Sequence, residues 1–136
     1  SFFKGQIRGL LQRTVEDLGS LVDQPVELLE EVKIPYGQGL SKRVDFAINI
    51  GGRNRFGFEV NFYTVSGSKP TEIKRAYSDL RRQLSQVGVE LIWITDGKGY
   101  RSMRRSLRDA YSVFPNIYNL QQAETHLRDD LMAMVR

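Results

Sequence analysis

Two consecutive segments that alternate apolar and polar residues, joined by a short glycine-rich loop, constrain the fold of this chain more than any other feature. Alternation with a period of two is typical of strands with one buried face. The apolar side chains that share this face are Val44, Phe46, Ile48 and Ile50 in residues 43–50, and Phe56, Phe58, Val60 and Phe62 in residues 55–65. The intervening Gly51-Gly52-Arg53-Asn54 is typical of a hairpin loop. The sequence therefore predicts two adjacent antiparallel strands.

The opposite face of this predicted hairpin carries polar side chains. Because side chains alternate along each strand, the apolar faces of two paired strands coincide only in every second register. One such register places Asp45 opposite Glu59, and a shift of two residues places Asp45 opposite Asn61. The sequence leaves the choice open, but either register puts these three side chains on one face.

The rest of the chain alternates between helical and extended patterns. Apolar residues recur at helical spacing in residues 3–18, 70–87, 101–114 and 121–136, and extended patterns occupy residues 26–34, 89–95 and 117–120. The run at 89–95 is almost continuously apolar and follows a helix, which is typical of a buried strand reached by a crossover. This order predicts an α/β fold, in which one mixed β-sheet is flanked by helices on both faces and residues 1–136 form a single domain.

Composition narrows the possible chemistry. The 136 residues include no cysteine and one histidine, His126, which excludes thiolate zinc sites, cysteine nucleophiles and sites that need two imidazoles. Carboxylates, lysines or amides must therefore carry any reaction. The formal net charge of +4 points weakly to a polyanionic partner. The apolar run at 91–94 is far shorter than the roughly 20 residues of a membrane span. The chain shows no signal peptide and begins without methionine, so we expect a piece of a longer protein.

Asp45 and Glu59 are the candidate chemical centre. Two carboxylates held close together on strands repel each other and lose hydration, and a divalent cation offsets that cost. Mg²⁺ prefers oxygen ligands and binds through one or two carboxylates together with substrate phosphate and water. Residues two apart on a strand face the same way, so Asn61 points at the same place. The alternative is a solvated face whose carboxylates pair with some of the many basic residues.

Several short strings resemble a known nuclease family. Arg43-Val44-Asp45-Phe46 followed by Phe58-Glu59-Val60-Asn61-Phe62-Tyr63 resembles the PD-(D/E)XK nuclease core. The DpnII/MboI-type restriction endonucleases are a narrower resemblance, carried also by Ser66-Gly67-Ser68-Lys69, Glu72, Leu91-Ile92-Trp93-Ile94-Thr95-Asp96-Gly97-Lys98-Gly99 and Ile117-Tyr118-Asn119-Leu120. The resemblance implies a restriction-endonuclease-like core. It also implies a cytoplasmic, Mg²⁺-dependent type II enzyme that cuts double-stranded DNA at or around GATC, within a longer chain. Cutting both strands of a palindrome favours a homodimer.

The resemblance also assigns site residues. Asp45 and Glu59 become metal ligands and catalytic residues, and Asn61 stands where most such nucleases have lysine. An amide can orient water or phosphate but supplies no charge, so Lys69 is the candidate cation, the alternative being a solvated loop residue. Members of the superfamily often take an extra acidic ligand from the first helix, which makes Glu16 a candidate. The alternative for Glu16 is an ordinary surface glutamate.

An arginine stripe is the candidate DNA-binding surface. Arg101, Arg104, Arg105 and Arg108 recur at helical spacing, and like charges so placed destabilise an isolated helix unless a phosphate backbone relieves them. We include Ser68 in the predicted DNA-contacting set; the alternative for the stripe is a solvated helix face. Two rival functions remain open: a non-catalytic DNA-binding module on a nuclease-like fold, and a repair or junction nuclease of the same superfamily.

Overall fold

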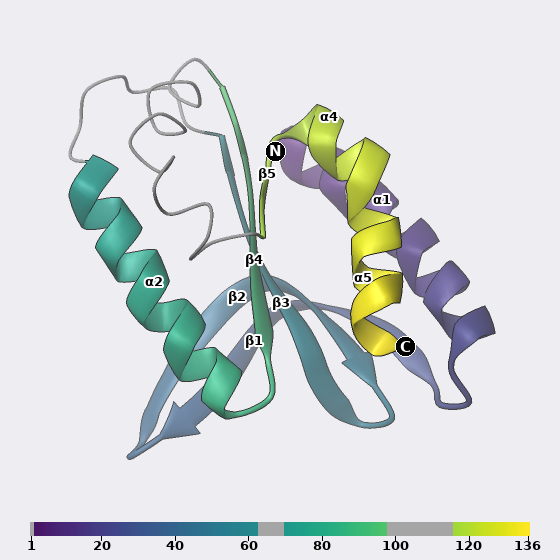
Figure 1. The fold of residues 1–136 in the computed structure, drawn as a ribbon, viewed down its shortest axis with the longest axis horizontal. Helices are drawn as coiled ribbons and strands as arrows, with labels where there is room; N and C mark the ends of the chain where they lie inside the picture. Colours follow the sequence, from purple (N-terminus) through teal and green to yellow (C-terminus); the bar gives the residue numbers. More distant parts are fainter. Residues whose placement is uncertain (1, 63–69, 98–115) are drawn as a thin grey trace.

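A computed structural model of the chain describes residues 2–62, 70–97 and 116–136. It shows a sheet with helices on both faces (Figure 1). The strands are β1 (Val26–Gly37), β2 (Leu40–Ile50), β3 (Arg53–Phe62), β4 (Glu90–Asp96) and β5 (Ile117–Tyr118). The helices are α1 (Phe2–Leu21), α2 (Pro70–Gln86), α4 (Leu120–Gln122), the π-helical η2 (Ala123–Leu127) and α5 (Arg128–Val135), of which the last three run on without a break.

The five strands form one sheet in the order β1-β2-β3-β4-β5. The first three are antiparallel neighbours, whereas β3, β4 and β5 run parallel to one another. Helix α2 makes the crossover between β3 and β4, as a parallel pair requires. The predicted mixed sheet in an α/β fold is therefore confirmed.

The predicted hairpin between β2 and β3 forms with a tighter turn than expected. Ile50 pairs with Arg53, so only Gly51 and Gly52 form the turn. Both glycines have positive φ angles, 60° and 86°, which glycine adopts without steric cost and which favour a two-residue hairpin. A register shift between Ile48 and Asn49 then sets Phe46 opposite Phe58, the last paired residues. This alignment brings Asp45 next to Glu59 rather than to Asn61. The structure thus selects one of the two registers that the sequence left open.

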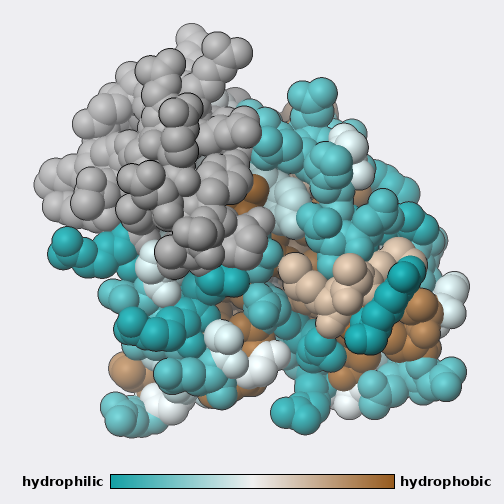
Figure 2. Space-filling view, in the orientation of Figure 1, coloured by the Kyte–Doolittle hydropathy of each residue, from teal (hydrophilic) through white to brown (hydrophobic). Residues whose placement is uncertain are grey.

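Each face of the sheet is covered by its own hydrophobic cluster. The larger cluster joins the sheet to α1 and the C-terminal helix, and its members include Ile7, Leu11, Phe46, Phe58 and Leu131. The smaller cluster lies under α2 and consists of Ile34, Val44, Ala47, Leu84, Val89 and Leu91. In the view of Figure 2, apolar side chains reach the surface mainly over α5, among mostly hydrophilic residues.

The prediction that Val44 shares a face with Phe46, Ile48 and Ile50 is wrong. Val44 belongs to the cluster under α2, whereas Phe46 belongs to the cluster under α1. The two strands β1 and β2 change faces together at Glu31 and Asp45, the residues between the pairs Glu30↔Phe46 and Val32↔Val44. Glu31 has a φ of 52°, a left-handed conformation that breaks the alternation of β1. Asp45 therefore lies where the strand reverses its faces.

The C-terminal part agrees with the predicted order but differs in detail. The strand predicted at 117–120 has only two residues, because Asn119 caps the following helix through a hydrogen bond from the Gln122 backbone nitrogen. The helix predicted at 101–114 lies outside the described residues. Within the ranges that the structure describes, no helix has the length and apolar character needed to cross a membrane.

Candidate active site

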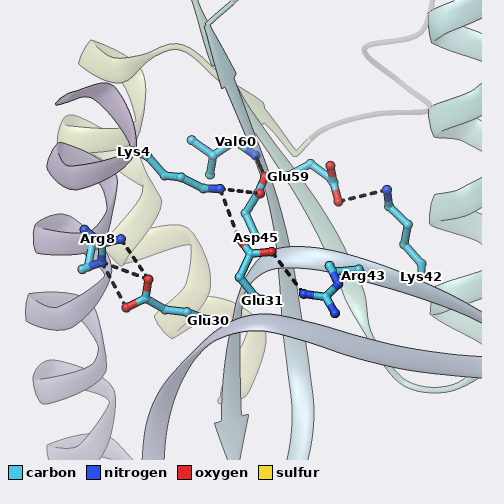
Figure 3. A network of polar contacts seen from close by, with 9 residues as sticks. All are labelled: Lys4, Arg8, Glu30, Glu31, Lys42, Arg43, Asp45, Glu59 and Val60. Carbon is cyan, nitrogen blue, oxygen red and sulfur yellow. Dashed lines mark hydrogen bonds and ion pairs between the residues drawn. The ribbon is translucent and has the colours of Figure 1, made fainter. Parts of the chain in front are cut away.

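The Asp45 carboxylate joins three elements of the fold (Figure 3). Its Oδ1 atom lies 2.8 Å from the ammonium group of Lys4, which extends from the first turn of α1. Its Oδ2 atom accepts a hydrogen bond of 2.7 Å from the backbone nitrogen of Val60 in β3. Asp45 thus takes the place of a ladder hydrogen bond where β2 and β3 separate. The same contact raises the pKa of Lys4, because the charged ammonium is favoured beside Asp45.

Glu59 lies beside Asp45 and is paired more weakly. Its Oε1 atom is 3.4 Å from the ammonium group of Lys42, which extends from β2. The same oxygen is buried and accepts no hydrogen bond from the described residues. Burial raises the pKa of Glu59, the charge of Lys42 opposes this, and the charge of Asp45 adds to it. The two negative charges therefore lie close enough to repel each other, as the sequence predicted.

Lys4 and Lys42 are site residues that the sequence analysis missed. Figure 3 shows them on opposite sides of the carboxylate pair, Lys4 reaching from α1 and Lys42 lying beyond Glu59. Nothing in the spacing of Lys4 indicates this contact, because it depends on how α1 packs against the sheet. Lys42 could have been suspected: it lies three residues before Asp45 in the same strand, and two close carboxylates need nearby cations.

A second group of ion pairs borders the site on the β1 side. Glu31 pairs with Lys4 at 3.2 Å and with Arg43 at 3.7 Å. One turn further along α1, Arg8 forms a two-pronged pair with Glu30, with its shortest contact at 2.9 Å. These contacts fix the position of α1 against β1, and therefore the approach of Lys4 to Asp45.

Asn61 lies at the end of β3, two residues after Glu59. It is exposed to solvent, and its Oδ1 atom accepts a hydrogen bond of 3.0 Å from the indole nitrogen of Trp93 in β4. Trp93 pairs with Glu59 in the parallel register of β3 and β4, so the indole and the Glu59 side chain lie on the same face of the sheet. The structure thus brings Asp45, Glu59 and Asn61 to one region of the sheet.

Glu16 does not join this group. It lies on α1 twelve residues after Lys4, which corresponds to about 18 Å along a helix axis. Its side chain is exposed, and no cluster of three or more potential metal ligands from His, Cys, Asp and Glu occurs in the described parts of the chain. The first turn of α1, rather than its fourth, reaches the carboxylates, and a metal-ligand role for Glu16 stays a prediction.

The remaining predicted site residues lie outside the described ranges. They are Ser68, Lys69, Arg101, Arg104, Arg105 and Arg108. Their roles stay predictions. Among the residues that the structure does describe, Lys4 and Lys42 are the cations paired with the two carboxylates.

The donor set fits a hard divalent cation. Asp45 and Glu59 offer carboxylate oxygens, and among the described residues the buried Oε1 atom of Glu59 is held only by the ion pair with Lys42 at 3.4 Å. Mg²⁺ commonly binds proteins through just one or two carboxylates and completes its shell with water and substrate phosphate. The chemistry of these two carboxylates therefore fits such a site.

Comparisons with known proteins point to one enzyme family. The family described as DpnII restriction endonuclease matches residues 9–130 of the chain. The type II restriction enzyme MboI of Moraxella bovis is 31% identical over 120 residues, covering 88% of this chain and 36% of the relative. The type II restriction enzyme DpnII of Streptococcus pneumoniae is 35% identical over 91 residues, covering 66% of this chain and 31% of the relative.

A less similar relative is also named a type II restriction enzyme. The type II restriction enzyme MjaIII of Methanocaldococcus jannaschii is 28% identical over 111 residues, covering 76% of this chain and 38% of the relative. The chain spans about a third of the length of these curated relatives. No solved structure matches the chain significantly.

Proposed function

The chain belongs to the DpnII restriction endonuclease family, and from this premise we propose that residues 1–136 form the nuclease catalytic domain of a Mg²⁺-dependent type II restriction enzyme. The reaction is the hydrolysis of a phosphodiester bond in double-stranded DNA, by in-line attack of water on phosphorus with departure of the 3′ oxygen. The relatives are named type II restriction enzymes, which supports this reaction. The resemblance of the chain to DpnII/MboI-type enzymes implies a GATC-like site. Cutting both strands of a palindromic site favours a homodimer. We expect the enzyme to act on DNA in the cytoplasm.

The observation that carries the proposal is the unequal pairing of two neighbouring carboxylates. Asp45 and Glu59 would hold Mg²⁺, and among the described residues the buried Oε1 atom of Glu59 is held only by the long ion pair with Lys42 at 3.4 Å. When bound, the ion polarises a phosphoryl oxygen and lowers the pKa of a water ligand. The alternative from the sequence is a solvated polar face. On such a face the carboxylate oxygens would be exposed, whereas the Oε1 atom of Glu59 is buried.

The chain's own residues supply position and charge. Lys42, paired with Glu59 at 3.4 Å and partly exposed, is placed to attract a phosphate once Glu59 turns to the cation. It thereby takes the role that the sequence suggested for Lys69. Asn61 donates a hydrogen bond from its amide to a phosphate oxygen, which needs no charge. Lys4 holds Asp45 in place from the opposite side.

One assay tests the function. The chain is incubated with unmethylated plasmid DNA, with and without Mg²⁺, and a Glu59→Ala variant is the matched control. Discrete fragments that require both Mg²⁺ and Glu59 support a restriction enzyme. A smear indicates a nonspecific nuclease, and intact DNA that migrates more slowly indicates a binding module; either result contradicts the proposal.

The arginine stripe predicted from the sequence has its own test. Each neutralised phosphate contributes about −0.9 to the slope of log K against log salt concentration. If Arg104 contacts the backbone, Arg104→Ala weakens binding to any DNA sequence and flattens that slope by about one unit. An unchanged slope would indicate that Arg104 does not contact the DNA backbone, which favours the alternative of a solvated helix face.

A further inference from the structure

The only tryptophan of the chain lies directly behind the candidate active site. Trp93 occupies the middle of β4 and is 1% exposed. Its register partner in β3 is Glu59. Its indole nitrogen donates a hydrogen bond of 3.0 Å to the side-chain oxygen of Asn61. A core residue is therefore in direct contact with an exposed polar residue of the site.

This hydrogen bond determines which end of the Asn61 amide is free for a ligand. An indole N–H can only donate, so its partner must be the amide oxygen and not the NH₂ group. The oxygen and the NH₂ group share one rigid plane, and fixing the first also fixes the second. The NH₂ group of Asn61 is consequently turned away from Trp93, and Asn61 as a whole is exposed.

Trp93 is itself held firmly. Its ring stacks on the ring of Tyr77 from α2, with centroids 4.0 Å apart and planes only 8° from parallel. Its backbone nitrogen donates a hydrogen bond of 2.9 Å to the carbonyl oxygen of Asn116, which precedes β5. A rotation of the indole would break this aromatic stack, which favours the observed orientation.

Tyr77 connects this stack to the carboxylates. Burial raises the pKa of Tyr77, and the negative charges of Glu59 and Asp45 raise it further. The ring that supports Trp93 is therefore close enough to the two carboxylates to feel their charge. The stack and the carboxylate pair form one continuous unit that links α2, β4 and β3.

We propose that Trp93 is a positioning residue, which holds the Asn61 amide so that its NH₂ group faces a DNA phosphate bound at the Asp45–Glu59 site. This inference rests on the proposed nuclease function. It narrows the role of Asn61 to that of a donor, because the carbonyl oxygen is already engaged. It also explains how a neutral side chain can serve at a position where the general nuclease motif has lysine: a donor that is fixed in advance needs no reorganisation.

A nuclear magnetic resonance experiment tests the hydrogen bond without any cleavage. With ¹⁵N-labelled protein, the chain gives a single indole N–H signal, from Trp93. Asn61→Ala removes the acceptor, and the indole proton signal moves upfield. Asn61→Asp keeps an oxygen acceptor, so its signal stays near the parental position or moves downfield. Both changes are at an exposed residue and leave the core intact. An unchanged signal in Asn61→Ala overturns the inference.

Cleavage rates test the positioning role. Trp93→Phe keeps an aromatic ring against Tyr77 but removes the N–H group. We expect kcat to fall roughly 10- to 100-fold with little change in KM, as when a residue that orients an active-site group is lost. Thr95→Val, a buried residue on the same face of β4, is the matched control and keeps the parental rate. Thermal unfolding of both variants sets an assay temperature at which each is folded.

A double-mutant cycle separates positioning from mere structural damage. If Trp93 acts through Asn61, Trp93→Phe costs little further activity in the Asn61→Ala background. An equal loss in both backgrounds, or a parental rate in Trp93→Phe alone, overturns the inference. If the parent chain does not cut DNA at all, the nuclease proposal fails, and the indole signal still decides whether Trp93 holds Asn61.

Discussion

The two carboxylates of the candidate site are held in opposite ways. Asp45 uses both oxygens within the fold, one on Lys4 at 2.8 Å and one on the Val60 backbone at 2.7 Å. Glu59 is held only by a looser ion pair within the described ranges, in which its buried Oε1 atom lies 3.4 Å from the ammonium group of Lys42. Asp45 is thus a structural joint as well as a candidate ligand, whereas Glu59 adds little to the fold.

This difference indicates which of the two carboxylates is the more available to bind a cation. A buried carboxylate without full compensation is costly, and its pKa rises because the charged form is disfavoured. Such residues cluster at functional sites, where a ligand supplies the missing partner. We therefore expect metal binding to act chiefly on the Glu59 side, while Asp45 fixes the place at which β2 and β3 separate.

The largest expected effect is the loss of cleavage on changing Glu59. Glu59→Ala should lower the Mg²⁺-dependent cleavage rate by about 10³-fold or more, because a group that stabilises charge in the transition state is lost. DNA binding without metal should be unchanged or tighter, because one negative charge near the phosphates is gone. Single-turnover cleavage and a mobility-shift titration measure both. Cleavage at the parental rate would remove Glu59 from the mechanism.

The two lysines should differ in the same sense as the carboxylates that they contact. Lys42→Gln should reduce the cleavage rate by about 10²-fold, the scale of losing one placed charge or donor. Lys4→Gln should instead act mainly on stability, because Lys4 ties α1 to the sheet. Lys33→Gln, an exposed lysine on β1, removes the same charge and should keep the parental rate. Equal rates for Lys42→Gln and Lys33→Gln would show that Lys42 supplies no charge to the reaction.

The sequence predicted the strands that carry the site, because alternation, the glycine pair and the polar face all concern neighbouring residues. It placed Asp45, Glu59 and Asn61 together, and the structure does bring them to one region. It could not predict the reversal of faces at Asp45, since that depends on the left-handed conformation of Glu31 in a different strand.

Contacts between distant segments were beyond the reach of the sequence pattern. Lys4 meets Asp45 only because α1 packs across the sheet, and no local spacing indicates this. The same geometry places Glu16 several turns away from the carboxylates: periodicity shows which face of a helix is buried but not which turn reaches a given strand. Trp93 looked like an ordinary core residue, and only its indole hydrogen bond reveals a link to the site.

Changing Asp45 should reduce the stability of the fold more than changing Glu59 does, although Glu59 is the residue expected to matter most for cleavage. Asp45→Ala removes the acceptor of the Val60 N–H group and the partner of Lys4, and should lower the free energy of unfolding by about 1–3 kcal/mol. Glu59→Ala should change it by less than about 1 kcal/mol. Urea unfolding of the two variants, in the presence of a chelator, measures both. Equal losses would mean that Glu59 is as firmly built into the fold as Asp45.

The smallest expected effect is the pH dependence that Glu59 gives to stability. Its pKa in the folded chain lies above its ordinary value of 4.5, so the folded state binds this proton more readily than the unfolded state. The contribution is most favourable below the ordinary pKa and is lost as pH rises through the folded pKa. Glu59→Gln removes this dependence.

Relative to the parent, Glu59→Gln should therefore gain stability as pH rises above the ordinary pKa of 4.5, by less than about 1 kcal/mol. Glu30→Gln is the matched control, because the hydrogen bond from Arg8 lowers the pKa of Glu30 and reverses the sign. Relative to the parent, that variant should lose stability as pH rises toward 4.5, and the difference should disappear as pH falls through the folded pKa. Urea unfolding in a chelator at several pH values measures both slopes. If the two slopes have the same sign, Glu59 is compensated like any paired surface carboxylate, and the contrast with Asp45 fails.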